Sequence, residues 1–355
     1  MSKKKFSKIS TIIHDAKRGK MFILVDDKNR ENEGDLVIPA SKCNSKSINF
    51  MAKHGRGLIC LALTKKQVDT LKLPLMSSVN KSRMQTAFTI SIEAKKGITT
   101  GISAQDRAKT IKVAIKPDVK KTEIVSPGHV FPLVARNGGV LERAGHTEAS
   151  VDISKLSKLN PSSVICEVMN EDGRMARLGD LFKFSKKHKI KLASIEDLIS
   201  YRLKYEKLIK RITTKTLFIK KIGKVNTYIY KNNLENNNNL VITKGAFNKK
   251  KSIPVRVLSY KIKNKNIFNN TKIKKSLLIL SKFKNFLLLI INNKNNISKE
   301  KNINTLRYYG IGAQIIKDLN IKNMILISRS KKKIIGLDGF GLKIKKQIII
   351  KWKKS

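Results

Sequence analysis

Three carboxylates and an arginine surround one glycine in the stretch Arg30-Glu31-Asn32-Glu33-Gly34-Asp35. It follows an apolar run, Met21 to Val25, whose length and branching are typical of a buried strand. Ionised carboxylates this close repel one another unless a cation or a proton lies among them. The stretch therefore predicts either a loop for a hard metal ion or acid–base chemistry, or a solvated acidic turn. Because the chain has 25 acidic residues against 76 basic ones, we favour the first alternative.

Three further stretches carry residue types suited to chemistry. Ser126-Pro127-Gly128-His129 presents an imidazole, which can transfer protons near neutrality. A glycine-rich segment, Gly138 to Thr147, ends in Arg143-Ala144-Gly145-His146-Thr147-Glu148. The apolar run Val164 to Val168 carries a single carboxylate, Glu167, which alone would more often be a paired core residue.

Periodicity and capping signals predict the elements that hold these stretches. We expect strands at Met21–Val25, Leu58–Leu63, Phe88–Ile92 and Val164–Val168, and helices at Ser10–Lys20, Ser45–His54, Lys65–Leu73, Ser103–Ile115 and Ser194–Tyr205. The loop Gly97 to Ser103 precedes a capped helix, and its amides would suit an anion, although most capped helices bind nothing.

Composition limits the class of protein. A net charge of +51 would suggest nucleic acid, but lysine rises together with asparagine and isoleucine, which indicates drift toward A/T-rich codons. Nucleic-acid binding is therefore not expected. Cys43, Cys60 and Cys166 are widely spaced, which favours a reducing compartment. No secretory signal is evident, and the apolar run Phe286–Ile291 is too short for a membrane span. We expect a cytoplasmic protein without a membrane segment.

A change in charge marks a domain boundary. Residues 206–355 hold 37 basic and five acidic residues, a net charge of +32, whereas residues 1–205 have a net charge of +19. We predict domains at 1–205 and 206–355. The asparagine-rich tracts Lys231–Asn239 and Asn293–Lys301 are predicted to be loops.

With these motifs in order, residues 8–203 resemble 3,4-dihydroxy-2-butanone 4-phosphate synthase, a lyase of riboflavin biosynthesis. The resemblance implies conversion of D-ribulose 5-phosphate to L-3,4-dihydroxy-2-butanone 4-phosphate and formate by a homodimer. It also implies Mg²⁺, for which Mn²⁺ should substitute. The implied fold is α/β (α+β), a three-layer domain with a mixed sheet between helices.

The resemblance assigns roles position by position. Glu31 and His146 correspond to the metal ligands, and His129 and Glu167 to the residues essential for turnover. The substrate-contact positions correspond to Arg30, Glu31, Asp35, Arg143, Ala144, Gly145, His146, Thr147 and Glu167.

From Glu206 onward the chain resembles GTP cyclohydrolase II, which implies a second, smaller α+β domain. The segments Leu306–Gln314 and Gly336–Gly341 carry the resemblance. The zinc-binding cysteines of that family are absent, since no cysteine or histidine occurs in residues 206–355. We therefore expect no zinc and an inactive domain. Arg307, Ser328 and Lys333 fit nucleotide-contact positions, so GTP binding stays open.

Two alternatives remain at this point. One is a bifunctional enzyme that retains GTP cyclohydrolase II activity. The other is a tail that binds RNA or a protein partner. Zinc content tests the first, and the salt dependence of RNA retention tests the second. His14, His54 and His188 match no motif and are expected to be surface or packing residues.

Overall fold

The computed structural model describes residues 6–28, 30–233, 237–248, 251–260, 267–292, 301–330 and 340–350, with the side chains of 267, 301–307 and 309 not described. The chain divides into two compact units, Met1–Ile199 and Ser200–Ser355. This division falls inside helix α7 (Ile195–Tyr205) rather than at its end, where the sequence places the boundary. The two units are described separately below.

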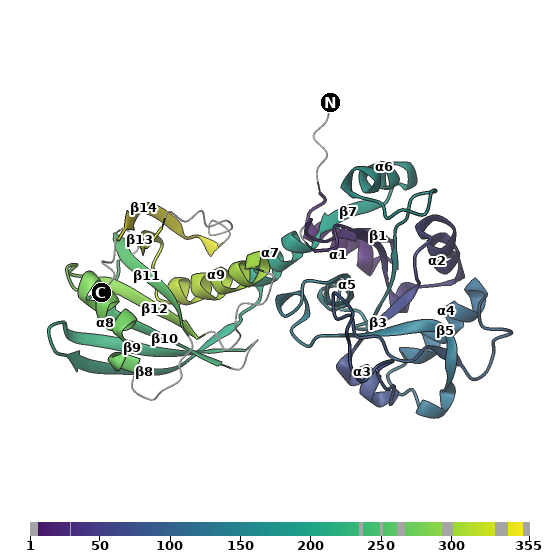
Figure 1. The fold of residues 1–355 in the computed structure, drawn as a ribbon, viewed down its shortest axis with the longest axis horizontal. Helices are drawn as coiled ribbons and strands as arrows, with labels where there is room; N and C mark the ends of the chain where they lie inside the picture. Colours follow the sequence, from purple (N-terminus) through teal and green to yellow (C-terminus); the bar gives the residue numbers. More distant parts are fainter. Residues whose placement is uncertain are drawn as a thin grey trace. The chain divides into compact units, whose positions relative to one another are not determined.

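The first unit is built on a mixed sheet of seven strands in the order β4-β5-β3-β6-β2-β1-β7 (Figure 1). Its strands are β1 (Phe22–Val25), β2 (Gly34–Pro39), β3 (Cys60–Thr64), β4 (Ile92–Ala94), β5 (Ile124–Ala135), β6 (Ser163–Glu167) and β7 (Lys191–Ser194). Its helices are α1 (Ile9–Lys17), α2 (Ser45–Phe50), α3 (Lys65–Thr70), α4 (Ala104–Ala114), α5 (His146–Leu156) and α6 (Leu178–His188), and α2 continues as a π-helical turn, Met51–Gly55.

Alternate side chains of the central strands face opposite helical layers. Leu61 of β3 belongs to the core cluster that includes Ile48 of α2 and Leu181 of α6. Ala62, the next residue, packs with Val151 of α5 on the other side. Since successive residues of a strand point to opposite faces, the sheet is covered on both. This confirms the predicted three-layer fold with a mixed sheet.

The predicted strand Phe88–Ile92 is wrong. Phe88 and Thr89 form only isolated bridges, and the paired strand β4 begins at Ile92. The alternation suggested that Phe88 and Ile90 face the core, yet Thr89 is the buried residue, and its amide donates to the Pro132 carbonyl. The alternation of side chains gave the wrong strand because the backbone of this segment forms hydrogen bonds with two different stretches of chain in turn.

The two predicted caps are present. The Ser103 hydroxyl accepts a hydrogen bond from the Asp106 amide, and the Ser194 hydroxyl accepts one from the Asp197 amide. The Asp106 carboxylate receives the amides of Thr99 and Gly101. The loop amides that could have served an anion at this helix start are therefore already paired within the protein.

The second unit also has a seven-stranded mixed sheet, in the order β14-β13-β11-β12-β10-β9-β8 (Figure 1). Its strands are β8 (Ile209–Ile219), β9 (Gly223–Asn232), β10 (Asn237–Lys244), β11 (Ser252–Tyr260), β12 (Phe286–Asn292), β13 (Asn323–Ser328) and β14 (Lys343–Ile349). Leu289 of β12 packs in one core cluster with residues of α9 (Lys301–Asp318), and Leu288 packs in another with residues of α8 (Thr271–Leu280). Burial on both faces explains why the run Phe286–Ile291 is continuously apolar.

The tract Lys231–Asn239 is not simply a loop, and this prediction is wrong at both of its ends. Asn237 and Asn239 lie in β10, where they pair with residues of β9. Their side chains also bond the Asn292 backbone: the Asn237 amide donates to its carbonyl, and the Asn239 side-chain oxygen accepts from its amide. Asparagine is here a source of hydrogen bonds within the sheet. Most of the other tract, residues 293–300, lies outside the described residues.

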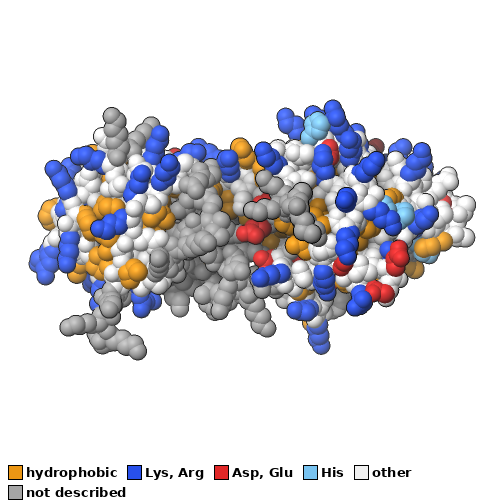
Figure 2. All heavy atoms as spheres, turned by 90° about the horizontal axis from the view of Figure 1, so that it is seen from above, with side chains coloured by type: hydrophobic (Ala, Val, Ile, Leu, Met, Phe, Trp, Pro, Cys, Tyr) orange, Lys and Arg blue, Asp and Glu red, His pale blue; other side chains and the backbone are white. Residues whose placement is uncertain are grey.

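The distribution of basic residues on the surface bears on the interpretation of the net charge. On the face shown in Figure 2, lysine and arginine side chains are scattered among other types rather than gathered in one patch. This distribution supports the interpretation of the charge as codon drift.

Among the described residues, no helix combines the length and apolar character needed to cross a membrane.

Candidate active site

Four separate elements bring together three carboxylates and one histidine that the sequence predicts as site residues. Asp35 on β2 is directly opposite Glu167 on β6 in the antiparallel register. Glu31 lies in the short loop between β1 and β2, and His146 is the first residue of α5. These four side chains, which are far apart in sequence, form what we call the acidic cluster.

Asp26, at the end of β1, shapes the loop that carries Glu31. Its carboxylate accepts hydrogen bonds from Arg30 Nη1 at 2.8 Å, from the Glu31 amide at 3.1 Å and from the Glu33 amide at 3.0 Å. On the outer side, Arg177 donates to the carbonyl oxygens of residues 31 and 32, both at 2.8 Å. The loop is thus held from both sides. Sequence pattern identified neither Asp26 nor Arg177 as a site residue, because only the folded chain shows their partners.

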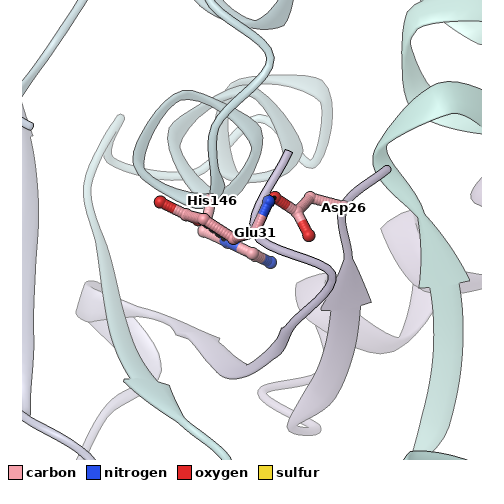
Figure 3. Close-up of side chains that lie close together, drawn as sticks. All are labelled: Asp26, Glu31 and His146. Atoms are coloured by element: carbon pink, nitrogen blue, oxygen red, sulfur yellow. Dashed lines mark hydrogen bonds and ion pairs between the residues drawn. The ribbon is translucent and has the colours of Figure 1, made fainter. Parts of the chain in front are cut away.

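Glu31 and His146 lie next to each other in the acidic cluster (Figure 3). Glu31 Oε2 lies 3.5 Å from His146 Nδ1, and Asp35 Oδ1 lies 3.8 Å from the same nitrogen. His146 is 6% exposed, and its Nε2 has no hydrogen-bond partner among the described residues. A buried ring nitrogen without a partner is costly in a stable core, so it is expected where a ligand binds.

These residues fit a divalent cation. Ligand atoms of Asp26, Glu31 and His146 all lie within 4.8 Å of one another. Two atoms bound to one Mg²⁺ at about 2.1 Å can lie no more than about 4.2 Å apart. Glu31 Oε2 and His146 Nδ1, which are 3.5 Å apart, satisfy this limit. Because Asp26 already accepts three hydrogen bonds, we assign it to the support of the loop. Glu31 and His146 remain as the ligands that the sequence predicts.

The pKa values of the groups in the acidic cluster suit a site that binds a cation. Burial opposes ionisation of Glu31, but the hydrogen bond from His146 and the charge of Arg30 lower its pKa to about 2. Burial raises the pKa of Asp35 to about 8. Burial alone would lower the pKa of His146, yet the nearby charges of Asp35 and Glu31 raise it to about 9. Asp35 and His146 lie 3.8 Å apart, and a cation bound between the carboxylates would compete with the protons that these two groups hold.

Glu167 is held at the edge of the acidic cluster by the chain that enters β3. Its Oε2 accepts the Leu58 amide at 2.8 Å. Gly57 packs directly against Glu167, and Cys60 is the first residue of β3, a short distance further along the chain. Burial, together with the charges of Glu167 and Asp35, raises the pKa of the Cys60 thiol, which stays protonated. From sequence, Cys60 indicated only a reducing compartment. The fold shows in addition that it lies near the carboxylates of Glu167 and Asp35.

The predicted substrate contacts in the segment Arg143 to Thr147 are mostly buried. Arg143 Nη1 donates to Glu148 at 2.6 Å, and its Nη2 donates to the Met84 carbonyl and to Thr86 Oγ1, each at 3.0 Å. The turn Ala144-Gly145 leads into α5, and Thr147 is 4% exposed in its first turn. Arg143 thus links the start of α5 to the segment around Met84.

A cavity of about 550 Å³ opens beside the loop. Its lining residues are Lys28, Arg30, Glu31, Asn32, Glu33, Arg83, Met84 and Arg177. Lys28 and Arg83, which no motif singled out, place positive charge on its wall next to the acidic Glu31. A small phosphorylated substrate has both a metal-binding end and an anionic end, and this cavity offers groups for each.

His129 forms no hydrogen bond or ion pair with the acidic cluster among the described residues. It lies on β5, is 43% exposed at its side chain, and contacts Glu93 of β4 through Nδ1 at 2.5 Å. In the second unit, Ser328 donates to the Ser330 carbonyl, while Lys333, the side chain of Arg307 and residues 336–339 lie outside the described residues.

Comparison with protein families gives two matches. Residues 10–201 match the family model for 3,4-dihydroxy-2-butanone 4-phosphate synthase. Residues 274–349 match the model for GTP cyclohydrolase II. The predicted resemblance of both parts is confirmed.

Individual relatives agree over nearly the whole chain. The riboflavin biosynthesis protein RibBA of Aquifex aeolicus is 43% identical over 98% of this chain and 93% of its own. A 3,4-dihydroxy-2-butanone 4-phosphate synthase of Photobacterium phosphoreum is 42% identical over 94% and 96%, respectively.

Two solved structures are similar. RibBX, a two-domain 3,4-dihydroxy-2-butanone 4-phosphate synthase from A. baumannii, superposes with a TM-score of 0.81 at 36% identity, covering 98% of this chain and all of its own. A synthase in complex with two magnesium ions gives a TM-score of 0.54 at 37% identity over 56% of this chain and 98% of its own.

Proposed function

The chain belongs to the 3,4-dihydroxy-2-butanone 4-phosphate synthase family, and we propose that the acidic cluster is its active site. The reaction is the conversion of D-ribulose 5-phosphate to L-3,4-dihydroxy-2-butanone 4-phosphate and formate, a step in riboflavin biosynthesis. One observation carries the assignment: Glu31, Asp35, Glu167 and His146 converge from four elements on one partly buried site beside a cationic cavity.

The residues of the acidic cluster suit the proton transfers that this reaction needs. Enolisation and dehydration of the sugar require a base and an acid held within reach of adjacent carbons. Glu167 is fixed by the Leu58 amide, which leaves its second oxygen for the substrate. Asp35, whose pKa burial raises to about 8, can hold a proton near neutral pH. A Mg²⁺ held by Glu31 and His146 would supply Lewis acidity toward the oxygens of the sugar.

The phosphate end of the substrate would lie toward the basic residues. We assign it to the predicted contacts Arg143 and Thr147, with Lys28 and Arg83 of the cavity wall as further cations. Arg143 is paired with Glu148 in this structure. It would therefore contribute positive charge near the phosphate rather than a free pair of guanidinium donors. Burial of Asp35 and His146 beside this cavity also limits the access of water to them.

The test is release of formate from D-ribulose 5-phosphate by the purified full chain. Activity should require Mg²⁺, should be lost with a chelator and should return with either Mg²⁺ or Mn²⁺. Formation of formate that is unaffected by removal of divalent ions would reject the metal assignment. Absence of formate under all metal conditions would reject the proposed function.

We also propose that the enzyme acts as a cytoplasmic homodimer. The support is the family resemblance, together with Cys43, Cys60 and Cys166, which are all free thiols, as suits a reducing compartment. Sedimentation equilibrium would test the dimer, and fractionation of the native host would test the location.

The second unit is proposed to be catalytically inactive. Residues 206–355 contain no cysteine or histidine, so three thiolates cannot assemble around zinc. The full chain should contain no stoichiometric zinc and release no formate from GTP, and the opposite result in either measurement would count against an inactive unit. A chain truncated after Tyr205 should still fold and act on ribulose 5-phosphate, and insolubility would reject the domain boundary at 205.

A further inference from the structure

His129 and Glu93 form a close pair on neighbouring strands outside the acidic cluster. The distance from His129 Nδ1 to Glu93 Oε1 is 2.5 Å. The Glu93 side chain is 14% exposed, whereas that of His129 is 43% exposed. The carboxylate is therefore the sheltered partner, and the imidazole is the one open to solvent.

The local strand geometry pushes His129 outward over Glu93. Ile92 pairs with Val130, but Glu93, the next residue, pairs with Val125. The stretch Ser126–His129 is extra chain on β5 with no partner on β4, and so it forms a bulge. A bulge re-aims a side chain that the regular ladder would have placed elsewhere. Here it brings the imidazole back onto the carboxylate of the opposite strand.

Glu93 is held in place from another direction by the loop before α4. Gly101 has φ +91° and packs so closely that a β-carbon there would overlap Glu93 Oε1. The Gly101 amide is in turn tied to Asp106 at 3.1 Å. An exposed ion pair has both partners mobile and contributes little. The immobilised Glu93 carboxylate instead resembles the groups that orient an imidazole in enzymes.

We propose that Glu93 is a positioning residue for His129. This rests on the proposed function, because the family resemblance behind that function assigns His129 to turnover. The Nδ1–H of the imidazole donates to Glu93 Oε1. This fixes both the ring orientation and the tautomer, so that the lone pair of Nε2 remains free to accept a proton from the substrate. When the ring is charged, the carboxylate stabilises it, and Nε2–H can return the proton.

The first test observes the pair directly. In the full-length protein with ¹⁵N-labelled histidine, long-range ¹H–¹⁵N spectra show which nitrogen of a neutral imidazole carries the proton. The chain has five histidines, and His129→Gln identifies the relevant signal by its loss. We expect the proton on Nδ1 in the wild type. A proton on Nε2 would overturn the proposal whatever the activity.

The second test is kinetic. Glu93→Gln should keep KM within about threefold but lower kcat by roughly 10²-fold, because an amide can donate to Nδ1 and favour the wrong tautomer. The double variant Glu93→Gln/His129→Gln should be no slower than His129→Gln alone, since Glu93 would act only through the imidazole. Glu171→Gln is the matched control, because its side chain is 82% exposed and lies outside the site.

The outcomes distinguish a role of His129 in turnover from the positioning role of Glu93. Near-normal kcat in His129→Gln would refute the role of His129 in turnover and, with it, any role for Glu93 through that residue. An inactive His129→Gln beside a fully active Glu93→Gln would leave the proposed function standing and overturn the positioning role. Additive losses in the double variant would also overturn it, because they would indicate an independent structural effect.

Discussion

Replacement of Gly57 by alanine should slow turnover by displacing Glu167 without touching the metal ligands. A β-carbon at position 57 would lie 2.5 Å from the Glu167 carbonyl oxygen and 2.6 Å from its Oε2, whereas ordinary contact begins at 3.4 Å. Glu167 or its strand must therefore shift by about 0.9 Å, and a displacement of about 1 Å in a reacting group costs roughly 10²-fold in rate. This loss corresponds to about 2.7 kcal/mol of barrier.

The assay is formate release at saturating ribulose 5-phosphate and Mg²⁺, together with the Mg²⁺ dependence of the rate. Gly57→Ala should lower kcat about 10²-fold and leave the half-saturating Mg²⁺ concentration unchanged within about threefold, because the three atoms nearest a β-carbon at position 57 all belong to Glu167. Gly179→Ala is the matched control: nothing lies within 4 Å of that position in α6, and alanine favours the helix. A Gly57→Ala enzyme with kcat within threefold of wild type would refute the placement of Glu167 at the reacting atoms.

Three further predictions concern the acidic cluster. Glu31→Gln and His146→Ala should each abolish Mg²⁺ binding, measured by calorimetry, and formate release, while circular dichroism stays unchanged; full activity at limiting Mg²⁺ would contradict the ligand assignment. Glu167→Gln should bind ribulose 5-phosphate normally yet turn over at least about tenfold more slowly, since an amide cannot carry a proton; a smaller effect would remove Glu167 from proton transfer. Without divalent ions, the melting temperature should fall between pH 6.5 and 9. The reason is that the pKa values of about 9 for His146 and about 8 for Asp35 are raised above their ordinary values, so that the stabilisation is complete at low pH and is lost as pH rises through them. Mg²⁺ and Asp35→Asn should each flatten this slope, and an unchanged slope in both would speak against Asp35 and His146 as its cause.

Local sequence was sufficient for the parts of this protein that depend on residue type and short spacing. The apolar run before Asp26 is a strand, and the hydroxyls of Ser103 and Ser194 cap helices as their positions predict. Glu31 and His146 could be paired from sequence alone, because both belong to motifs of one family. The absence of cysteine and histidine after residue 205 was likewise readable directly.

Tertiary structure decided which groups meet. Asp35 faces Glu167 only because β2 and β6 pair in one particular register, and no periodicity within either strand contains that register. The expected strand at Phe88–Ile92 failed for the same reason, since its hydrogen bonds go to two distant segments. Glu93 carried no sequence signal, yet the bulge on β5 sets it against His129. Side-chain pattern reports which face of an element is buried, whereas contacts between elements depend on register and on loop closure, which only the folded chain fixes.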